Sequence, residues 1–158
     1  MSQRIGELSD QALLEERAAI DAELKRRGLS GDIGEIGERL AIEYFNRTAG
    51  LPGLAPAPRG TKNIDAISRT GDRYSIKTLM RAKKTGTIYP GEGGGDHPLF
   101  EFILILILSD RYELQGIYRL SWEQFVQLRS WDRRMNAWYL IRSSRVLGAA
   151  EALMAPSV

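Results

Sequence analysis

The sequence contains no cysteine and a single histidine, His97, among its 158 residues. The absence of cysteine excludes disulfides, thiolate metal sites and cysteine nucleophiles, and it is typical of proteins in the reducing cytoplasm. With one histidine, a histidine-rich metal site or a Ser-His-Asp triad has little support. We therefore expect a cytoplasmic protein with neither kind of site.

The chain also lacks a long apolar run and a large excess of charge of one sign. Its most apolar stretch, Phe100 to Leu108, has nine residues, whereas a helix that spans a bilayer needs about 20. The N-terminus is polar and acidic, unlike a secretory signal, so no membrane association is expected. Because the net charge is only +2, a nucleic-acid partner would have to meet a local basic patch.

Length and composition indicate one globular domain over residues 1–158, with 43% hydrophobic and 27% charged residues. We divide it into an N-terminal helical extension (1–30), a core (31–110) and C-terminal strands with a helix (111–158). The order of the predicted elements indicates an α/β fold with a mixed sheet flanked by helices. Outside the segments discussed below, strands are predicted at 54–58, 100–108, 113–120 and 137–141, and helices at 122–130 and, weakly, after 142.

Residues 9–27 have every local signal of a helix. Ser9 or Asp10 can cap its start, and Gly28 can end it. A narrow apolar stripe, formed by Leu13, Ile20 and Leu24, runs along it. We expect this stripe to pack on the body of the domain. The alternative is that it packs on the same helix of a second copy, which would make a homodimer.

A second helix is predicted at 32–47, and one of its carboxylates is out of place. Glu38 falls inside the apolar arc of the helix, whereas Glu35 lies near the edge of that arc. A carboxylate on an apolar face is costly unless a cation or metal meets it, which makes Glu38 a candidate ligand. The alternative is that the arc is wider than the buried face and leaves Glu38 half exposed at its rim.

Residues 61–79 are predicted to form a hairpin of two short strands. A three-residue loop, Thr70-Gly71-Asp72, would set Asp65 directly across from Lys77 on one face. An acid and an amine placed in this way are components of a metal-dependent phosphodiesterase site. The alternative is an ordinary salt bridge across the surface of a hairpin.

The following segment, 81–98, is rich in glycine and begins with three basic residues. Arg81, Lys83 and Lys84, together with Lys62, are candidate contacts to the phosphates of a nucleic acid. A mobile loop with such a start can close over a nucleic-acid backbone, although a solvated connection would have the same composition.

These candidates together have the composition of a site for a hard metal ion. Magnesium prefers oxygen ligands, and Asp65, Glu38 and the carbonyl of Ile76 can supply them, with manganese as an alternative ion. Such an ion polarises a phosphodiester and activates water. Lys77 would orient or deprotonate that water and offset charge in the transition state.

The order of these residues resembles that of a known group. A helix with Gly37-Glu38-x-x-Ala41 precedes Asp65 on one strand, Ser75-x-Lys77 on its partner, and then an apolar strand. Over residues 31–110 this is similar to the core of the PD-(D/E)xK nuclease superfamily, which has a restriction-endonuclease-like fold. The segment at 131–138, WDRRMNAW, is similar to the tail of small uncharacterised bacterial members.

The resemblance implies that Asp65 is the metal-binding aspartate, Lys77 the lysine, and Glu38 the helix glutamate of RecB-like members. Two positions depart from the pattern: Ile64 replaces the proline of the motif, and Ser75 stands where the second carboxylate normally lies, so Glu38 or Glu35 would have to supply the missing charge.

These features together predict a metal-dependent endonuclease acting on DNA, in restriction or in defence against phage, with RNA still open as a substrate. The alternative is a weak or inactive protein of the same fold that binds nucleic acid or dimerises.

Overall fold

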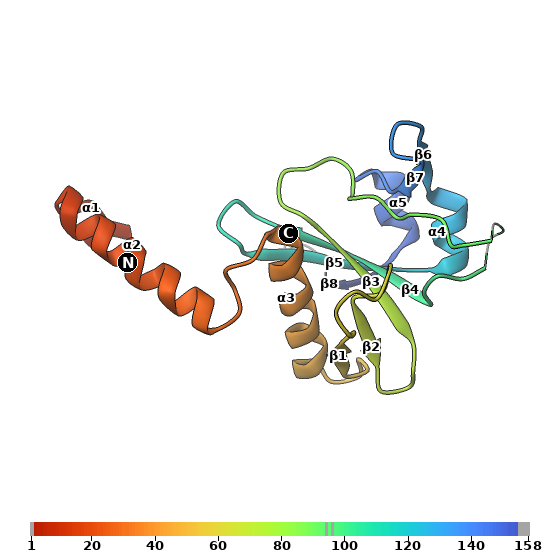
Figure 1. Cartoon of the computed structure of the whole chain (residues 1–158), viewed down its shortest axis with the longest axis horizontal. Helices are drawn as coiled ribbons and strands as arrows, with labels where there is room; N and C mark the ends of the chain where they lie inside the picture. The colour runs from red at the N-terminus through yellow and green to blue at the C-terminus, as the bar shows by residue number, and fades with distance from the viewer. Residues whose placement is uncertain (1, 94, 96, 155–158) are drawn as a thin grey trace.

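The computed structural model describes residues 2–93, 95 and 97–154, and these residues form an α/β fold around a mixed sheet (Figure 1). In this part of the chain the sheet has six strands in the order β1-β2-β3-β4-β5-β8. Only β3 and β4 pair in parallel, and the other neighbours are antiparallel. The strands are β1 (Leu54–Pro56), β2 (Ala66–Ser68), β3 (Arg73–Leu79), β4 (Phe102–Leu108), β5 (Leu114–Ser121) and β8 (Glu151–Met154).

The helices predicted at 9–27, 32–47 and 122–130 form, and the cap predicted at Ser9 is present. The described helices are α1 (Ser2–Gly6), α2 (Asp10–Arg26), α3 (Ile33–Arg47), α4 (Trp122–Leu128) and α5 (Ser144–Ala149). Ser9, Asp32 and Ser121 each accept a hydrogen bond from a backbone N–H in the first turn of the helix that follows. Gly28 ends α2 with a φ of +72°, a conformation that side chains with a Cβ rarely adopt.

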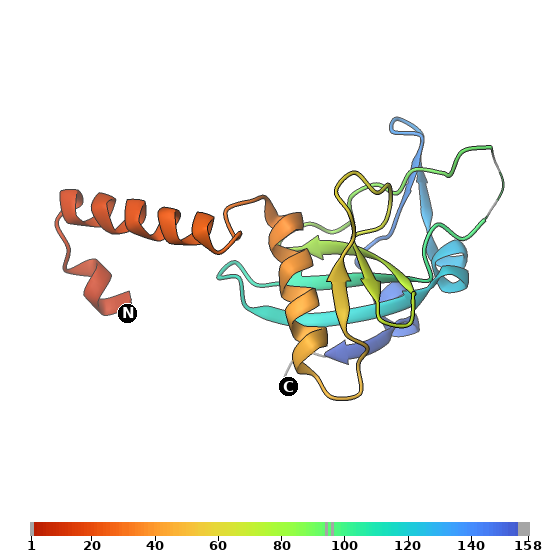
Figure 2. The same ribbon diagram turned by 60° about the horizontal axis from the view of Figure 1, so that its bottom comes forward.

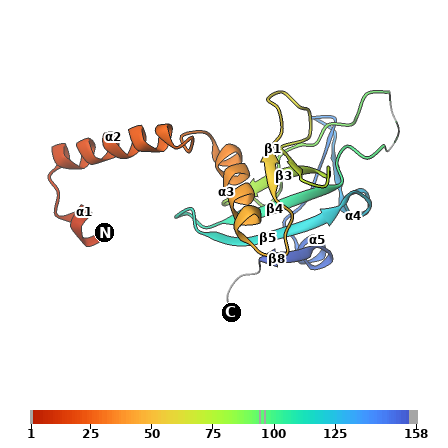
Figure 3. The same cartoon turned by 90° about the horizontal axis from the view of Figure 1, so that it is seen from below.

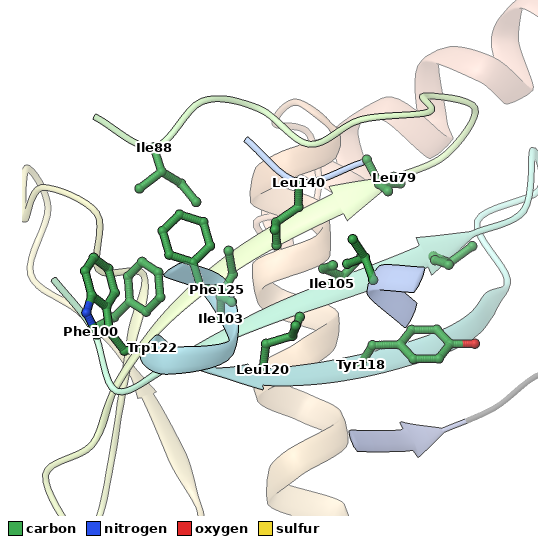
Figure 4. Close-up of a cluster of buried hydrophobic side chains, with 12 residues drawn as sticks. Leu79, Ile88, Phe100, Ile103, Ile105, Tyr118, Leu120, Trp122, Phe125 and Leu140 are labelled. Atoms are coloured by element: carbon green, nitrogen blue, oxygen red, sulfur yellow. The ribbon is translucent and has the colours of Figure 1, made fainter. Parts of the chain in front are cut away.

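Helices cover both faces of the sheet, and this buries β4, whose side chains are apolar on both faces. Alternate residues of β4 enter two separate cores. One core lies between the sheet and α4 and α5, and it includes Ile103, Ile105 and the aromatic side chains of Trp122 and Phe125 (Figure 4). The other core lies under α3, which crosses the opposite face of the sheet (Figure 2). The expectation of a mixed sheet flanked by helices is therefore confirmed.

The prediction that the N-terminal helix packs on the body is wrong. Helices α1 and α2, which we call the arm, project away from the sheet (Figures 1 and 3). No described side chain of α2 is buried, and Leu13 and Ile20 of the predicted stripe are 43% and 52% exposed. The stripe is too narrow to hold the helix against the body, and the alternative of pairing with a second copy stays a prediction. None of the described helices is long and apolar enough to cross a membrane.

Two strands near the C-terminus differ from the prediction. Residues after α4 form a separate two-stranded hairpin of β6 (Ser130–Asp132) and β7 (Ala137–Tyr139), of which the sequence indicated only the second strand. The weakly predicted C-terminal helix is α5, and the strand β8 follows it and pairs with β5 at the edge of the sheet. Both missed strands are short, with three and four residues, so their alternation gives little signal.

Candidate active site

The β2–β3 hairpin has a three-residue loop, but the loop lies one residue earlier than predicted. The N–H of Ser68 donates to the carbonyl of Asp72, and Ile67 pairs with Arg73, so the loop is 69–71. Gly71 takes a φ of +90°, as this kind of loop requires. The shift moves the register by two residues, so that Asp65 does not lie directly across from Lys77. Because two residues is one full period of a strand, both side chains keep the predicted face.

Asp65 is fixed between two strands at the point where β2 begins. Its N–H donates to the carbonyl of Tyr74 (2.8 Å), and its own carbonyl accepts from the N–H of Ala57 (2.9 Å). Its side-chain Oδ2 accepts from the N–H of Ile76 (2.7 Å). In a strand, the N–H and C=O of one residue point to the same side. The Ile76 carbonyl therefore points to the same edge as the Asp65 carboxylate.

Helix α3 brings Glu38 to this edge, and Gly37 allows the helix to come close. A Cβ on Gly37 would overlap the hydroxyl of Thr78 on β3 and would lie 2.7 Å from Thr78 Cβ. The absence of a side chain at 37 thus lets α3 lie directly on β3. The next residue, Glu38, reaches the carboxyl group of Asp65.

The Glu38 and Asp65 carboxylates, which we call the carboxylate pair, repel one another electrostatically. Partial burial and the charge of Asp65 raise the pKa of Glu38 to about 7, with smaller contributions from Glu35 and Asp32. Two carboxylates held together in this way are stabilised by a bound cation, which would lower the pKa of Glu38 again. The pair lies in an open hollow of about 460 Å³, lined by Glu35, Glu38, Arg39, Ile42, Glu43, Pro56 and Asp65.

Lys77 lies beside the carboxylate pair but outside the lining of that hollow. Its Nζ donates to the carbonyl of Thr87 (3.2 Å). Burial lowers the pKa of Lys77 below its ordinary value, while the charges of Asp65 and Glu38 act in the opposite direction. Both carboxylates are thus close enough to Lys77 to affect its protonation. A lysine with a lowered pKa is a better base near neutral pH.

Ser75 occupies the position of the expected second carboxylate, and it is only 1% exposed. The structure gives it a buried place on β3 rather than a place on the wall of the hollow. Glu35 is exposed in the first turn of α3 and does line the hollow. Of the two helix glutamates, Glu38 is the one that interacts with Asp65.

The candidate phosphate contacts have different surroundings. Lys62, Lys83 and Lys84 are exposed, and Lys84 Nζ lies 5.1 Å from the centre of the Tyr139 ring. Arg81 is also exposed, but its Nε forms an ion pair with Asp110 (2.6 Å). Residues 84–88 do not form a free loop, because Lys84 and Ile88 pair with Ile141 and Trp138. The start of the predicted mobile loop is therefore part of the folded body.

The oxygen atoms present suit a small divalent cation, although they are few. They are one carboxylate from Glu38, one from Asp65 and the carbonyl of Ile76, which is the kind of donor set that magnesium accepts when water completes its shell. Among the described residues there is no cluster of three or more histidine, cysteine, aspartate or glutamate side chains that could hold a metal. A larger hollow, of about 580 Å³, lies between the arm and the body and contains none of the candidate residues.

Sequence reasoning missed the contact between Gly37 and Thr78 that places the helix. The hydroxyl of Thr78 is buried and has no hydrogen-bond partner in the described part of the protein. A glycine on the apolar face of the helix, one residue before the partly buried Glu38, is the signal that could have indicated a close helix–strand contact.

Comparisons with known proteins identify no relative: no family model matches the chain, and no curated protein sequence matches it.

Proposed function

We propose that this protein is a metal-dependent nuclease with a restriction-endonuclease-like core that hydrolyses phosphodiester bonds in DNA. The observation that carries the proposal is the meeting of Glu38 and Asp65, from a helix and a hairpin, beside a lysine whose pKa is lowered. The helix, the two strands of the hairpin and the apolar strand β4 come in the order on which the resemblance to the PD-(D/E)xK superfamily is based.

In this proposal the chain's own residues hold a magnesium ion and position a water molecule. Glu38, Asp65 and the Ile76 carbonyl are the metal ligands, with manganese as an alternative ion. When bound, the ion would polarise the phosphate and increase the acidity of a water. Lys77 would orient that water or accept its proton, and the lowered pKa that burial gives this lysine favours the role of a base. Lys62, Lys83 and Lys84 contact the flanking phosphates.

Glu38 replaces the carboxylate that Ser75 lacks. Ser75 is buried, so its role in the proposal is to support β3 next to Lys77 rather than to bind the ion. This assignment makes Glu38 essential and Glu35 dispensable, although both carboxylates line the same hollow.

A cleavage assay tests the proposal. Supercoiled plasmid, linear duplex DNA, single-stranded DNA and RNA would be incubated with the protein in magnesium, manganese or EDTA. We expect cutting that requires the metal, is lost in Asp65→Asn and Glu38→Gln, and is kept in Glu35→Gln, the matched control on the same helix. Equal cutting in EDTA, or full activity of Glu38→Gln, would contradict the proposed site.

A second candidate function is a nucleic-acid-binding or dimerising module of the same fold without catalytic activity. The observations that favour it are Ser75 in place of a carboxylate and the exposed apolar side chains of the arm. Under this alternative no substrate is cut by the wild-type protein under any condition of the assay, while nucleic-acid binding is unaffected by EDTA.

A further inference from the structure

Positive charge is concentrated in two segments that lie next to each other in the fold. Residues 81–84 and 129–145 contain eight lysines and arginines and one acid, so their net charge is +7, whereas the whole chain has +2 and the remainder therefore −5. The two segments meet through the pairing of Lys84 with Ile141, and the N–H of Arg142 donates to the carbonyl of Lys83. These two neighbouring segments, which we call the basic patch, form a local concentration of positive charge in which Arg81 is paired with Asp110.

The basic patch includes the β6–β7 hairpin, which stands at the edge of the molecule opposite the arm (Figures 1 and 2). The turn of this hairpin is Arg133-Arg134-Met135-Asn136. Asp132 Oδ1 accepts from the N–H groups of Arg134 (3.0 Å) and Met135 (3.1 Å), which fixes the shape of the turn. Arg133 and Arg134 are exposed, and neither forms an ion pair with a described carboxylate.

Two tryptophans face each other across this hairpin. The rings of Trp131 and Trp138 are 4.7 Å apart between their centres and meet edge to face. The guanidinium of Arg129 lies 3.8 Å from the centre of the Trp138 ring. Trp138 is partly buried by these contacts, whereas Trp131 is 41% exposed. The hairpin therefore presents the supported indole ring of Trp131 to solvent, next to the exposed side chains of Arg133 and Arg134.

The same hairpin is linked to the candidate active site by backbone hydrogen bonds. The N–H and carbonyl of Trp138 pair with the carbonyl and N–H of Ile88 (2.8 and 2.7 Å). The preceding residue, Thr87, accepts the hydrogen bond from Lys77 Nζ. Paired strands are about 4.8 Å apart, so the hairpin backbone at Trp138 lies one strand spacing from Ile88, the residue after the one that accepts the hydrogen bond from Lys77.

We propose that the β6–β7 hairpin is a binding site for a single-stranded segment of nucleic acid, in which an unpaired base stacks on Trp131 and Arg133 and Arg134 bind the adjacent phosphates. An exposed aromatic ring next to basic side chains is the combination that binds unpaired bases without sequence preference. The proposed function is needed only to infer that the bound nucleic acid runs from the hairpin toward Lys77. Binding itself does not depend on cleavage.

The test is a binding measurement in EDTA, where the proposed cleavage does not occur. Fluorescently labelled oligo(dT), its RNA counterpart and a duplex of the same length would be titrated with the full chain. We expect the single strands to bind more tightly than the duplex and to quench tryptophan fluorescence. Trp131→Ala should weaken single-strand binding by about tenfold or more, Trp131→Phe should retain most of it, and the pair Arg133→Ala and Arg134→Ala should reduce the dependence on salt.

Tyr112→Ala is the matched control, because Tyr112 is an aromatic residue that is 57% exposed on the turn between β4 and β5, away from the hairpin. It should bind as the wild type does. Trp131→Ala with unchanged affinity, or a duplex bound as tightly as the single strand, would overturn the stacking role. If the wild-type protein binds the single strand as expected but cuts no substrate in the presence of metal, the result would count against the proposed function and leave the hairpin proposal intact.

Discussion

Replacing Lys77 with methionine is expected to reduce DNA cleavage by roughly a thousandfold, the range in which loss of a general base falls. The protein should nevertheless remain folded. Burial lowers the pKa of Lys77 because the charged form is costly to desolvate, and methionine fills a similar volume without a charge. We expect the melting temperature of Lys77→Met to be equal to or higher than that of the wild type. Because the pKa of Lys77 is lower in the folded than in the unfolded protein, the gain should increase as the pH falls. Cleavage rates and thermal melts measure both effects.

Two further variants separate the possible roles of this lysine. Lys77→Arg keeps a positive charge but cannot act as a base, so it should be as inactive as Lys77→Met if proton transfer is the role. Lys25→Met, on the exposed surface of α2, should have no effect on either measurement. A fully active Lys77→Met would contradict the catalytic role of Lys77, and a Lys77→Met that unfolds would contradict its expected effect on stability.

Replacing Gly37 with alanine should have the largest effect on stability. The new Cβ would overlap the hydroxyl of Thr78 and would lie 2.7 and 2.8 Å from its two carbon atoms, Cβ and Cγ2. Helix α3 would have to move off β3, at a cost of about 3 kcal/mol, which corresponds to a decrease in melting temperature of roughly 6–12 °C. Because Glu38 follows Gly37 directly, we also expect cleavage to decrease more than the loss of folded protein explains.

The contact with Thr78 can be tested by a double substitution. Thr78→Ala removes the hydroxyl and Cγ2, so Gly37→Ala combined with Thr78→Ala should recover part of the lost stability. Gly148→Ala on α5, where a Cβ would meet nothing within 4 Å, is the control and should be neutral or slightly stabilising. Equal effects of alanine at positions 37 and 148 would contradict the close packing of α3 on β3.

Much of the fold follows from local signals that agree with one another. The caps at Ser9, Asp32 and Ser121 and the doubly apolar run of β4 each determine one element, and the structure contains all of them. The face shared by Asp65 and Lys77 was also predictable, because a shift of two residues in the loop does not change which side a strand residue faces.

The remaining features depend on contacts that local patterns do not contain. The loop position in the β2–β3 hairpin is set by Ser68, whose backbone N–H bonds Asp72 and whose side chain accepts from the Asp72 N–H. The arm was expected to pack because Leu13 and Ile20 are apolar, but a stripe does not reveal whether a partner surface exists. The burial of Ser75 depends on which elements cover the sheet at that point, and the alternation of a short strand does not indicate this.

Binding of a divalent cation by the carboxylate pair is tested most directly by calorimetric titration with Mn²⁺. With one carboxylate pair, the wild type should bind one ion per chain. Because the pKa of Glu38 is about 7, ion binding at pH 7 should release part of a proton, and the affinity should increase as the pH rises through that value. Asp65→Asn and Glu38→Gln should each lose this binding, whereas Glu123→Gln, exposed on α4, should keep it. A wild type that binds no Mn²⁺, or variants at Asp65 and Glu38 that bind it equally well, would contradict the account.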